Sequence, residues 1–575
     1  MTPALPSAGT ISITEVLALL DGQFQEMAEA VTHDRYALWL GSGISRDQLP
    51  PLDLVLQRLL EFLRAKIDPT VKDCKFRATL VEILELAPLS NDDWKVIDFN
   101  RPATEWPKFA EITKSLILQY ARVLDIAPAG EEVDYLVWEA IDGARTYGDP
   151  TTEPDIEHLC IAILMMEGLA SDIVSANWDG LVEKAVEQLA GGLPVLRVCV
   201  LDQDTRTDRQ RGNLYKFHGC AVLAARDEAT YRPKLVGRAS QINGWTDQRN
   251  NEVMLSKLVE IVTSKPTLML GLSAQDSNIQ GVFVAAQNRM AWPWPSHPPA
   301  FVFSNDKLGP DHKTLLQNVY KGAYDAANRE PIEQSALLRA NGKSLLPALC
   351  LHVAATKLCR LIDLLFEHFS QPERAKLHAG VTALRNQVAA TAVILGKEPF
   401  VRSMIGFSGR TMSLFLGGKE PHPVGPQYRP ISATPIQLLN ADPFLTISGT
   451  KELSVGIGLL GICVLSAGWT AEEPEAGTVR PGAFQVRTGT TVLQVFFAAS
   501  AQSAEQLVGN SLVGLTDEAI IIHSHAIPSP MARAARRAPG RTGLPGLQEV
   551  SIAKVCEGIT NTDDLVRRFR EEVAL

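Results

Sequence analysis

The chain has 575 residues, of which 46% are hydrophobic and 21% are charged, and its formal net charge is −10. That composition is typical of a folded globular protein and excludes a largely disordered chain. The negative net charge argues against broad, nonspecific binding of nucleic acid, although a local basic patch is compatible with it. None of the eight cysteines forms a C-x-x-C pair, which excludes zinc-ribbon and thioredoxin-type motifs and fits reduced thiols in a cytoplasm.

The first part of the chain predicts a strand, a glycine turn and a helix. Residues 1–14 lack the features of a signal peptide, so we expect a cytoplasmic protein. Residues 11–32 carry apolar positions at helical spacing. The run YALWL at 36–40 is typical of a short buried strand and leads directly into GSGIS at 41–45. An amphipathic helix is predicted over 52–64.

Residues 66–170 are interpreted as a mostly helical insertion, and beyond them short aliphatic runs alternate with helical segments. That alternation predicts a Rossmann-like α/β fold, with a parallel sheet and helices on both faces. Ligands of such sheets bind at the carboxyl ends of the strands, and this sequence has polar motifs at those ends. The predicted strands are 172–176, 193–201, 213–219, 267–273 and 300–304, with helices after 180 and near 250–263 and 276–290.

The last third of the chain has a different character. We expect helices through 311–370, whereas glycine and proline become frequent after 371. We therefore predict a first domain of 1–370 and a C-terminal α+β domain of 371–575 with a regulatory, oligomerisation or partner-binding role. This second domain is expected to contain strands at 491–499 and 519–527, a charged helix at 562–573, and exposed loops at 470–482 and 527–546.

The longest apolar stretch, 453–469, contains four glycines and two serines. It falls short of the ~20 strongly apolar residues of a membrane span. We expect it to be a buried strand–turn or helix segment, and we expect no membrane partner.

Each polar motif also has an ordinary structural explanation. GSGIS is typical of a plain tight turn as well as of a phosphate-binding turn, and Arg46 stands where a G-x-G-x-x-G motif has its third glycine. Asp179 is well placed to cap the helix that follows it. His218 ends a predicted strand, where a histidine is either structural or a general base near neutral pH. Taken singly, these motifs leave both interpretations open.

Taken together, the motifs resemble those of the sirtuin family. GSGIS, SANWDGL (175–181), YKFHG (215–219), LGLS (270–273) and FSND (303–306) follow one another as GAGIS, TQNID, HG, GTS and a strand ending in Asn do in sirtuins. The resemblance covers about 36–306 and does not extend to the C-terminal domain. It implies that NAD binds at these motifs. The cofactor-binding residues carried over are Gly41, Ser42, Gly43, Ile44, Ser45, Gly271, Ser273, Asp276 and Asn305.

The same resemblance implies three catalytic residues. Asn177 would hold the nicotinamide ribose or a reactive water, and Asp179 would recognise the nicotinamide carboxamide. His218 would act as the general base. Two departures separate the chain from protein-deacylating sirtuins: it lacks the zinc module with its two C-x-x-C pairs, and it reads RDQLPP at 46–51 where they read roughly GIPDFR.

The variant motifs, with NWD in place of NID and G-x-S-x-x-D ending at Asp276, resemble the sirtuin-like domains of bacterial anti-phage defence proteins. Members of that branch hydrolyse NAD and deplete it during infection. We therefore expect an NAD glycohydrolase that cleaves NAD, its substrate, to nicotinamide and ADP-ribose without a metal. Two alternatives stay open: a sirtuin-type deacylase or ADP-ribosyl transferase, and a non-catalytic sensor of NAD or ADP-ribose.

An unregulated NADase would kill its host, so regulation is expected. We predict a homo-oligomer or a complex with a defence partner, such as a short argonaute carrying a guide or a ring-forming ATPase. The loop 527–546 holds four arginines and no interleaved aromatic residues. We interpret it as a solvated linker rather than a nucleic-acid contact.

Overall fold

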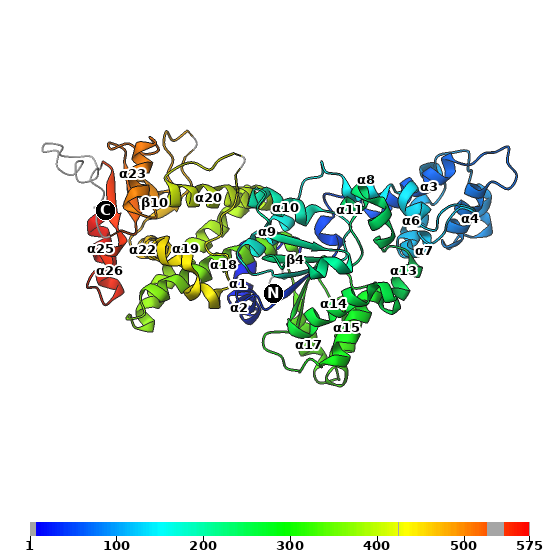
Figure 1. Ribbon diagram of the computed structural model, residues 1–575, viewed down its shortest axis with the longest axis horizontal. Coiled ribbons are helices and arrows are strands. Elements are labelled where there is room, and N and C mark those ends of the chain that lie inside the picture. Colours follow the sequence, from blue (N-terminus) through cyan, green and yellow to red (C-terminus); the bar gives the residue numbers. More distant parts are fainter. Residues whose placement is uncertain (1–6, 424, 476, 526–545, 574–575) are drawn as a thin grey trace, which may run out of the picture.

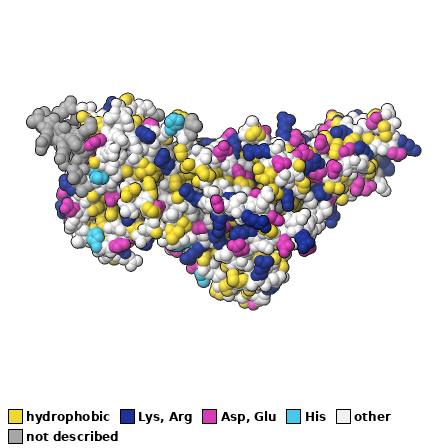
Figure 2. Space-filling model, viewed as in Figure 1, with side chains coloured by type: hydrophobic (Ala, Val, Ile, Leu, Met, Phe, Trp, Pro, Cys, Tyr) yellow, Lys and Arg dark blue, Asp and Glu magenta, His cyan; other side chains and the backbone are white. Residues whose placement is uncertain are grey.

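A sheet of seven strands lies at the centre of an elongated molecule, with a helical lobe at one end and the C-terminal part of the chain at the other (Figure 1). The computed structural model describes residues 7–423, 425–475, 477–525 and 546–573. On the face shown in Figure 2, acidic and basic side chains are mixed over the helical lobe rather than separated by sign.

The central sheet is entirely parallel, in the order β3-β4-β2-β1-β5-β6-β7. Its strands are short and mostly buried, because helices cover both faces. This confirms the predicted Rossmann-like α/β class, and only the last strand has no counterpart in the prediction. The strands are β1 (Ala37–Leu40), β2 (Asp172–Ser175), β3 (Leu196–Cys199), β4 (Gly212–Lys216), β5 (Thr267–Leu270), β6 (Phe301–Ser304) and β7 (Leu337–Leu338).

Two hydrophobic cores sandwich this sheet, and successive residues of β1 alternate between them. Leu38 and Leu40 pack into one core, whereas Ala37 and Trp39 pack into the other. The first core takes apolar residues from α1 (Ile13–Leu20), α2 (Gln25–Thr32), α9 (Ile156–Met166), α10 (Leu181–Ala190) and α18 (Gly342–Leu365). The second takes them from α14 (Glu252–Ser264), α15 (Ser277–Arg289), α16 (Pro310–Tyr320) and α17 (Arg329–Ala336).

The chain changes direction across the sheet between β1 and β5. After β1 it continues to β2 on one side, and after β5 it continues to β6 on the other. The loops that follow β1 and β5 therefore leave their neighbouring strands in opposite directions. Such a switch point is where open α/β sheets bind their ligands.

The helical lobe has a hydrophobic core of its own, which runs from Leu52 to Tyr147 and also contacts Trp178. By contrast, α9, which lies within the predicted insertion, packs into the first core of the sheet. The domain boundaries stay a prediction. The helices of the lobe are α3 (Leu52–Ala65), α4 (Lys75–Glu85), α5 (Asn91–Val96), α6 (Phe109–Ile117), α7 (Tyr120–Val123) and α8 (Gly143–Gly148), with a π-helical turn at Leu136–Ala140. Between β4 and α14 lie α11 (Ala221–Arg226), α12 (Glu228–Tyr231) and α13 (Ala239–Gly244).

The C-terminal part combines a five-stranded mixed sheet with helices, which confirms the predicted α+β class. In the order β12-β11-β10-β9-β8, the first three strands are parallel and the others antiparallel. The strands are β8 (Thr470–Glu472), β9 (Phe484–Thr488), β10 (Thr491–Ala498), β11 (Ala519–His523) and β12 (Gln548–Ser551). The helices are α19 (Gln371–Leu395), α20 (Lys397–Gly417), α21 (Pro443–Ile447), α22 (Thr450–Ser466), α23 (Ala501–Gly509), α25 (Ile552–Cys556) and α26 (Thr562–Val573).

The frequent glycines and prolines after 371 gave no indication of the long helices α19 and α20. Instead, Gly380 of α19 packs against Gly458 and Gly461 of α22, where an added Cβ would strike backbone atoms of the facing helix. Strand β8 occupies the start of the loop expected at 470–482. Residues 11–32, where apolar positions recur at helical spacing, form the two helices α1 and α2 with a turn at 21–24. Residues 527–545 of the loop expected at 527–546, which include all four of its arginines, lie outside the described residues.

Among the described residues, Gly342–Leu365 is the one helix that is long and apolar enough to cross a membrane. Of its most apolar window, 72% is buried inside the protein. Such burial is the pattern of a core helix. The apolar stretch 453–469 lies mostly within α22, in agreement with one of the two structures expected for it.

Candidate active site

The predicted site residues follow five neighbouring parallel strands. The glycine turn at 41–45 follows β1, Asn177 and Asp179 follow β2, and His218 follows β4. The segment 271–276 follows β5, and Asn305 follows β6. Because the carboxyl ends of parallel strands meet at one edge, all these residues lie along the same edge of the sheet.

The glycine turn and the turn after β5 touch through their backbones. Gly41 N donates to the Leu270 carbonyl and Gly43 N donates to the Gly271 carbonyl, each over 3.0 Å. A Cβ on Gly41 would lie 2.5 Å from the Gly271 oxygen, and one on Gly43 would lie 2.6 Å from Gly271 Cα. Gly271 itself has a φ of +61°, which favours glycine. The glycines at these positions are therefore required for the close approach of two turns at the switch point.

Asn177 and Asp179 are buried behind that turn, with 8% and 5% of their surface exposed. Asn177 Nδ2 donates to the Gly41 carbonyl over 3.1 Å and lies 3.5 Å from Ser45 Oγ. Asp179 Oδ1 accepts from the backbone N–H of Leu181, the first residue of α10, while Oδ2 accepts from Ser45 Oγ over 2.9 Å. Asp179 therefore contacts the glycine turn and also holds the first backbone N–H of the following helix, next to the N-cap residue Gly180.

His218 is buried, with its Nε2 atom 2.5 Å from Asn278 Nδ2. The orientation of the Asn278 amide follows from its oxygen, which accepts the Ile279 backbone N–H. Nδ2 therefore donates to Nε2, and the ring proton belongs on Nδ1, which faces the Ala176 backbone. Burial lowers the pKa of His218, against the opposing effect of the Asp276 charge. At neutral pH the ring is thus a neutral imidazole with an acceptor at Nε2.

The helical lobe contributes aromatic side chains to this edge. The Tyr120 hydroxyl donates to Asp276 Oδ1 over 3.2 Å, and the Tyr147 ring meets the Trp178 ring edge-on at 5.5 Å between centroids. Burial raises the pKa of Tyr147 to about 12, with a further contribution from the Asp179 charge. These contacts place a wall of the lobe directly beside the loops after β2 and β5.

Other contacts hold the lobe against the segment after β4. Arg232 makes a bidentate ion pair with Asp134, with both N–O distances at 2.7 Å. Ser240 donates to Asp125 from its backbone N–H and its hydroxyl over 2.7 and 2.6 Å. The lobe is therefore anchored on both sides of the polar edge.

Not every predicted residue joins this group. Ser273 is exposed. Asn305 uses its backbone N–H to reach the Leu338 carbonyl and its side-chain oxygen to accept the Asp306 N–H. In the described part of the chain, no hydrogen bond connects Asn305 with Asn177, Asp179 or His218.

Sequence reasoning missed two buried residues that contact the site. Asn278 stands two positions after Asp276, and a longer reading of that motif would have included it. His158 lies in the first turn of α9, and its Nε2 atom is 3.1 Å from Ser45 Oγ. No strand-end motif marks His158, because it enters the site from a helix.

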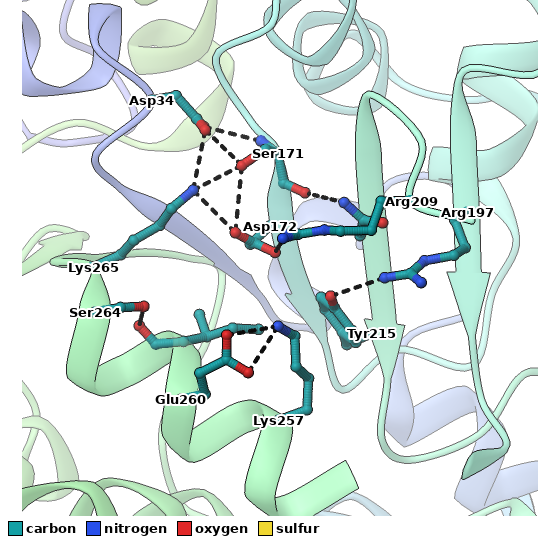
Figure 3. Close-up of polar contacts among 12 residues, drawn as sticks. Asp34, Ser171, Asp172, Arg197, Arg209, Tyr215, Lys257, Glu260, Ser264 and Lys265 are labelled. Atoms are coloured by element: carbon teal, nitrogen blue, oxygen red, sulfur yellow. Dashed lines mark hydrogen bonds and ion pairs between the residues drawn. The ribbon is translucent and has the colours of Figure 1, made fainter. Parts of the chain in front are cut away.

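The opposite edge of the sheet has a different polar cluster (Figure 3). Lys265 Nζ lies 3.0 Å from Asp172 Oδ2, 3.2 Å from Asp34 Oδ2 and 2.7 Å from Ser171 Oγ. These residues stand just before or at the start of β1, β2 and β5, so they join the amino ends of three neighbouring strands. We call this group the amino-edge cluster.

Part of the chain matches a known protein family. Residues 171–322 match a family model described as a SIR2-like domain. The matched segment includes Asn177, Asp179 and His218 and leaves out the glycine turn and the helical lobe. No curated protein matches the chain. In the residues that the structure describes, no group of three or more His, Cys, Asp or Glu side chains is placed to hold a metal ion.

Proposed function

We propose that the sirtuin-like domain of this chain is an NAD glycohydrolase, which uses water to split NAD into nicotinamide and ADP-ribose. The observation that carries the proposal is the burial of Asn177, Asp179 and a neutral His218 at the carboxyl edge of adjacent strands. A sirtuin-like domain by itself indicates an NAD-related function. Hydrolysis is the finer step that we propose.

In this reaction the bond between nicotinamide and C1 of the ribose breaks, and its electron pair leaves with the nicotinamide nitrogen. The ribose passes through an oxocarbenium-like state, as in glycoside cleavage. The oxygen of one water bonds to C1, and the water gives up a proton. His218 Nε2 has the lone pair for that proton once the Asn278 amide gives way to the water or to a ribose hydroxyl.

The two remaining polar groups fit the task of orienting the substrate. The Asp179 carboxylate accepts hydrogen bonds, and the nicotinamide carboxamide offers N–H donors. The Asn177 amide uses Nδ2 within the protein, which leaves its oxygen on the other side to hold a water or a hydroxyl. Tyr120, Tyr147 and Trp178 form an aromatic wall that would limit the entry of bulk water.

The proposal extends to regulation by the C-terminal part. One helix, α18, enters both the first sheet core and the core of the C-terminal sheet. Between these cores, its fully buried Lys357 pairs with Glu167 Oε2 over 2.7 Å and donates to the Ser432 carbonyl. A partner or a second copy bound to the C-terminal part would thus act on a helix shared with the catalytic sheet. The biological outcome that we propose is depletion of NAD during phage infection.

The direct test is to incubate the full chain with NAD and to measure nicotinamide and ADP-ribose by chromatography. We expect both products from the wild type, and a loss of about 10²–10⁴-fold in kcat for His218→Ala. Asn177→Ala should lose activity as well. The matched control is Arg209→Gln, because Arg209 is an exposed member of the opposite edge. Its activity should equal that of the wild type.

If the wild type releases no product, calorimetry with NAD separates the alternatives. Tight binding without turnover would favour a sensor or an inhibited enzyme that needs its trigger. No binding would contradict an NAD site. Release of nicotinamide only in the presence of an acylated peptide would identify a deacylase instead.

A further inference from the structure

We infer that His158 is a positioning residue of the proposed NADase, which acts through the Ser45 hydroxyl on the Asp179 carboxylate. The inference rests on the proposed function for its kinetic test. His158 lies in the first turn of α9, outside every motif at the carboxyl edge. It is fully buried, and Ser45 and Asp179 are 1% and 5% exposed.

The direction of each hydrogen bond follows from the first donor. The backbone N–H of Asp155 donates to His158 Nδ1 over 3.1 Å, so Nδ1 is an acceptor and the ring proton lies on Nε2. Nε2 then donates to Ser45 Oγ over 3.1 Å. Because Ser45 Oγ already accepts from Nε2, its own proton is donated to Asp179 Oδ2 at 2.9 Å. The hydrogen bonds therefore all run in the same direction and form a hydrogen-bond chain from α9 to the Asp179 carboxylate.

Burial makes this chain strong and keeps its direction. Hydrogen bonds in a dry interior polarise one another, and a group that loses its partner there pays the full cost of desolvation. Burial also lowers the pKa of His158, so the ring is neutral at neutral pH, as the chain requires. With Ser45 fixed on one carboxylate oxygen and Leu181 N on the other, Asp179 has a single orientation.

The chain also reaches the second catalytic side chain. Ser45 Oγ lies 3.5 Å from Asn177 Nδ2, whose other contact is the Gly41 carbonyl. One hydroxyl therefore stands between the groups proposed to hold the carboxamide and the water. If His158 only capped α9, its hydrogen bond with the Asp155 backbone would be sufficient. The further hydrogen bond to Ser45 is the feature that joins α9 to the site.

Two substitutions separate the cap from the chain. His158→Asn keeps an acceptor at the position of Nδ1 for the Asp155 N–H but removes the donor to Ser45. His158→Gln keeps a donor at the position of Nε2 and weakens the cap. We expect His158→Gln to retain kcat to within about threefold and His158→Asn to lose about tenfold or more, since small displacements of catalytic groups are costly. Both variants should unfold within a few degrees of each other.

A double-mutant cycle checks that the two residues act as one unit. Ser45→Ala should lose as much activity as His158→Asn, and the double variant should be no worse than either. A loss of activity in the double variant equal to the product of the two single losses would overturn the inference. So would full activity of His158→Asn, or equal losses in the Asn and Gln variants.

One measurement does not depend on NAD cleavage. Nitrogen-15 NMR of histidine-labelled protein, with His158→Gln to assign the signal, reports the tautomer of His158 directly. We expect the ring proton on Nε2. A proton on Nδ1 would contradict the inferred direction of the hydrogen bonds, and so overturn the inference, even in an active enzyme. If the wild type cleaves no NAD, the calorimetry described above decides the proposed function. The inference then stands or falls on the tautomer and on whether His158→Asn, but not His158→Gln, weakens binding of ADP-ribose in calorimetry.

Discussion

The two edges of the central sheet are built from similar residue types but are organised differently. At the amino edge, Lys265 meets Asp34, Asp172 and Ser171 in one compact group in which opposite charges pair directly (Figure 3). At the carboxyl edge, no ion pair among the described residues joins the Asp179 carboxylate, which is held by a hydroxyl and a backbone N–H, while the buried Lys216 donates to the Asp179 backbone carbonyl. The first arrangement neutralises charge and joins strands. The second leaves a charge and a lone pair at the switch point, which is the arrangement that binding and catalysis require.

The largest effect on stability is expected from a substitution at the amino edge, Lys265→Met. Lys265→Met removes the cation that Asp34 and Asp172 share and leaves Asp172 only the exposed Arg209, so we expect the free energy of unfolding to fall by about 2–4 kcal/mol. The rate of NAD cleavage per folded molecule should not change. Urea unfolding together with the product assay measures both quantities, and a large loss of kcat would contradict the separation of the two edges.

A smaller effect is expected from the close approach of the two turns at the carboxyl edge. Gly271→Ala places a Cβ 2.6 Å from Ile44 N at a φ of +61°, which should cost about 1–3 kcal/mol of stability. Activity should fall too, because the glycine turn carries Ser45. The matched control is Gly192→Ala, at a φ of +82° with open space around it. It shares the backbone strain without the collision, so equal effects on activity in both variants would contradict our explanation.

The pH dependence of stability provides a third comparison. Burial lowers the pKa of both His158 and His218 from the ordinary value of 6.5. Between their folded pKa values and 6.5, the unfolded chain binds more protons than the folded chain. The contribution of these two histidines to the free energy of unfolding is therefore fully present above about pH 6.5. It is lost as the pH falls, by up to about 1.4 kcal/mol per pH unit for each histidine.

Urea unfolding at a series of pH values tests this expectation. His158→Gln and His218→Gln should each flatten the slope below pH 6.5. A wild-type slope no steeper than that of the two glutamine variants would show that the buried rings accept protons in the folded state.

The smallest effect is expected where the helical lobe meets the site. Tyr120→Phe removes one hydrogen bond to Asp276 and leaves the ring in place, at a cost of about 0.5–1.5 kcal/mol. We expect KM for NAD to rise a few fold with little change in kcat. Arg122→Gln, an exposed neighbour on the same helix α7, should have no effect. A loss of kcat alone would indicate that Tyr120 acts in the reaction rather than in closing the site.

The comparison also shows where sequence patterns are informative. The strands of the parallel sheet were predictable because each is a short apolar run between helices, and the polar motifs after them fall on one edge as a consequence of topology. In the C-terminal part the same reasoning did not locate the long helices α19 and α20. Glycine there serves the contact between Gly380 and Gly461, and a contact between distant helices leaves no local pattern.

The sequence alone determined the fold class, the order of the motifs and the positions of Asn177, Asp179 and His218 along the chain. Those features depend on local periodicity and on residues next to each other in the chain. Only the tertiary structure decided that His158 and Asn278 contact them, that Gly41 and Gly43 pack on Gly271, and that Tyr120 and Tyr147 reach the site from the lobe. Each of these contacts joins segments that are far apart in the chain, and such proximity arises only when burial brings the segments together.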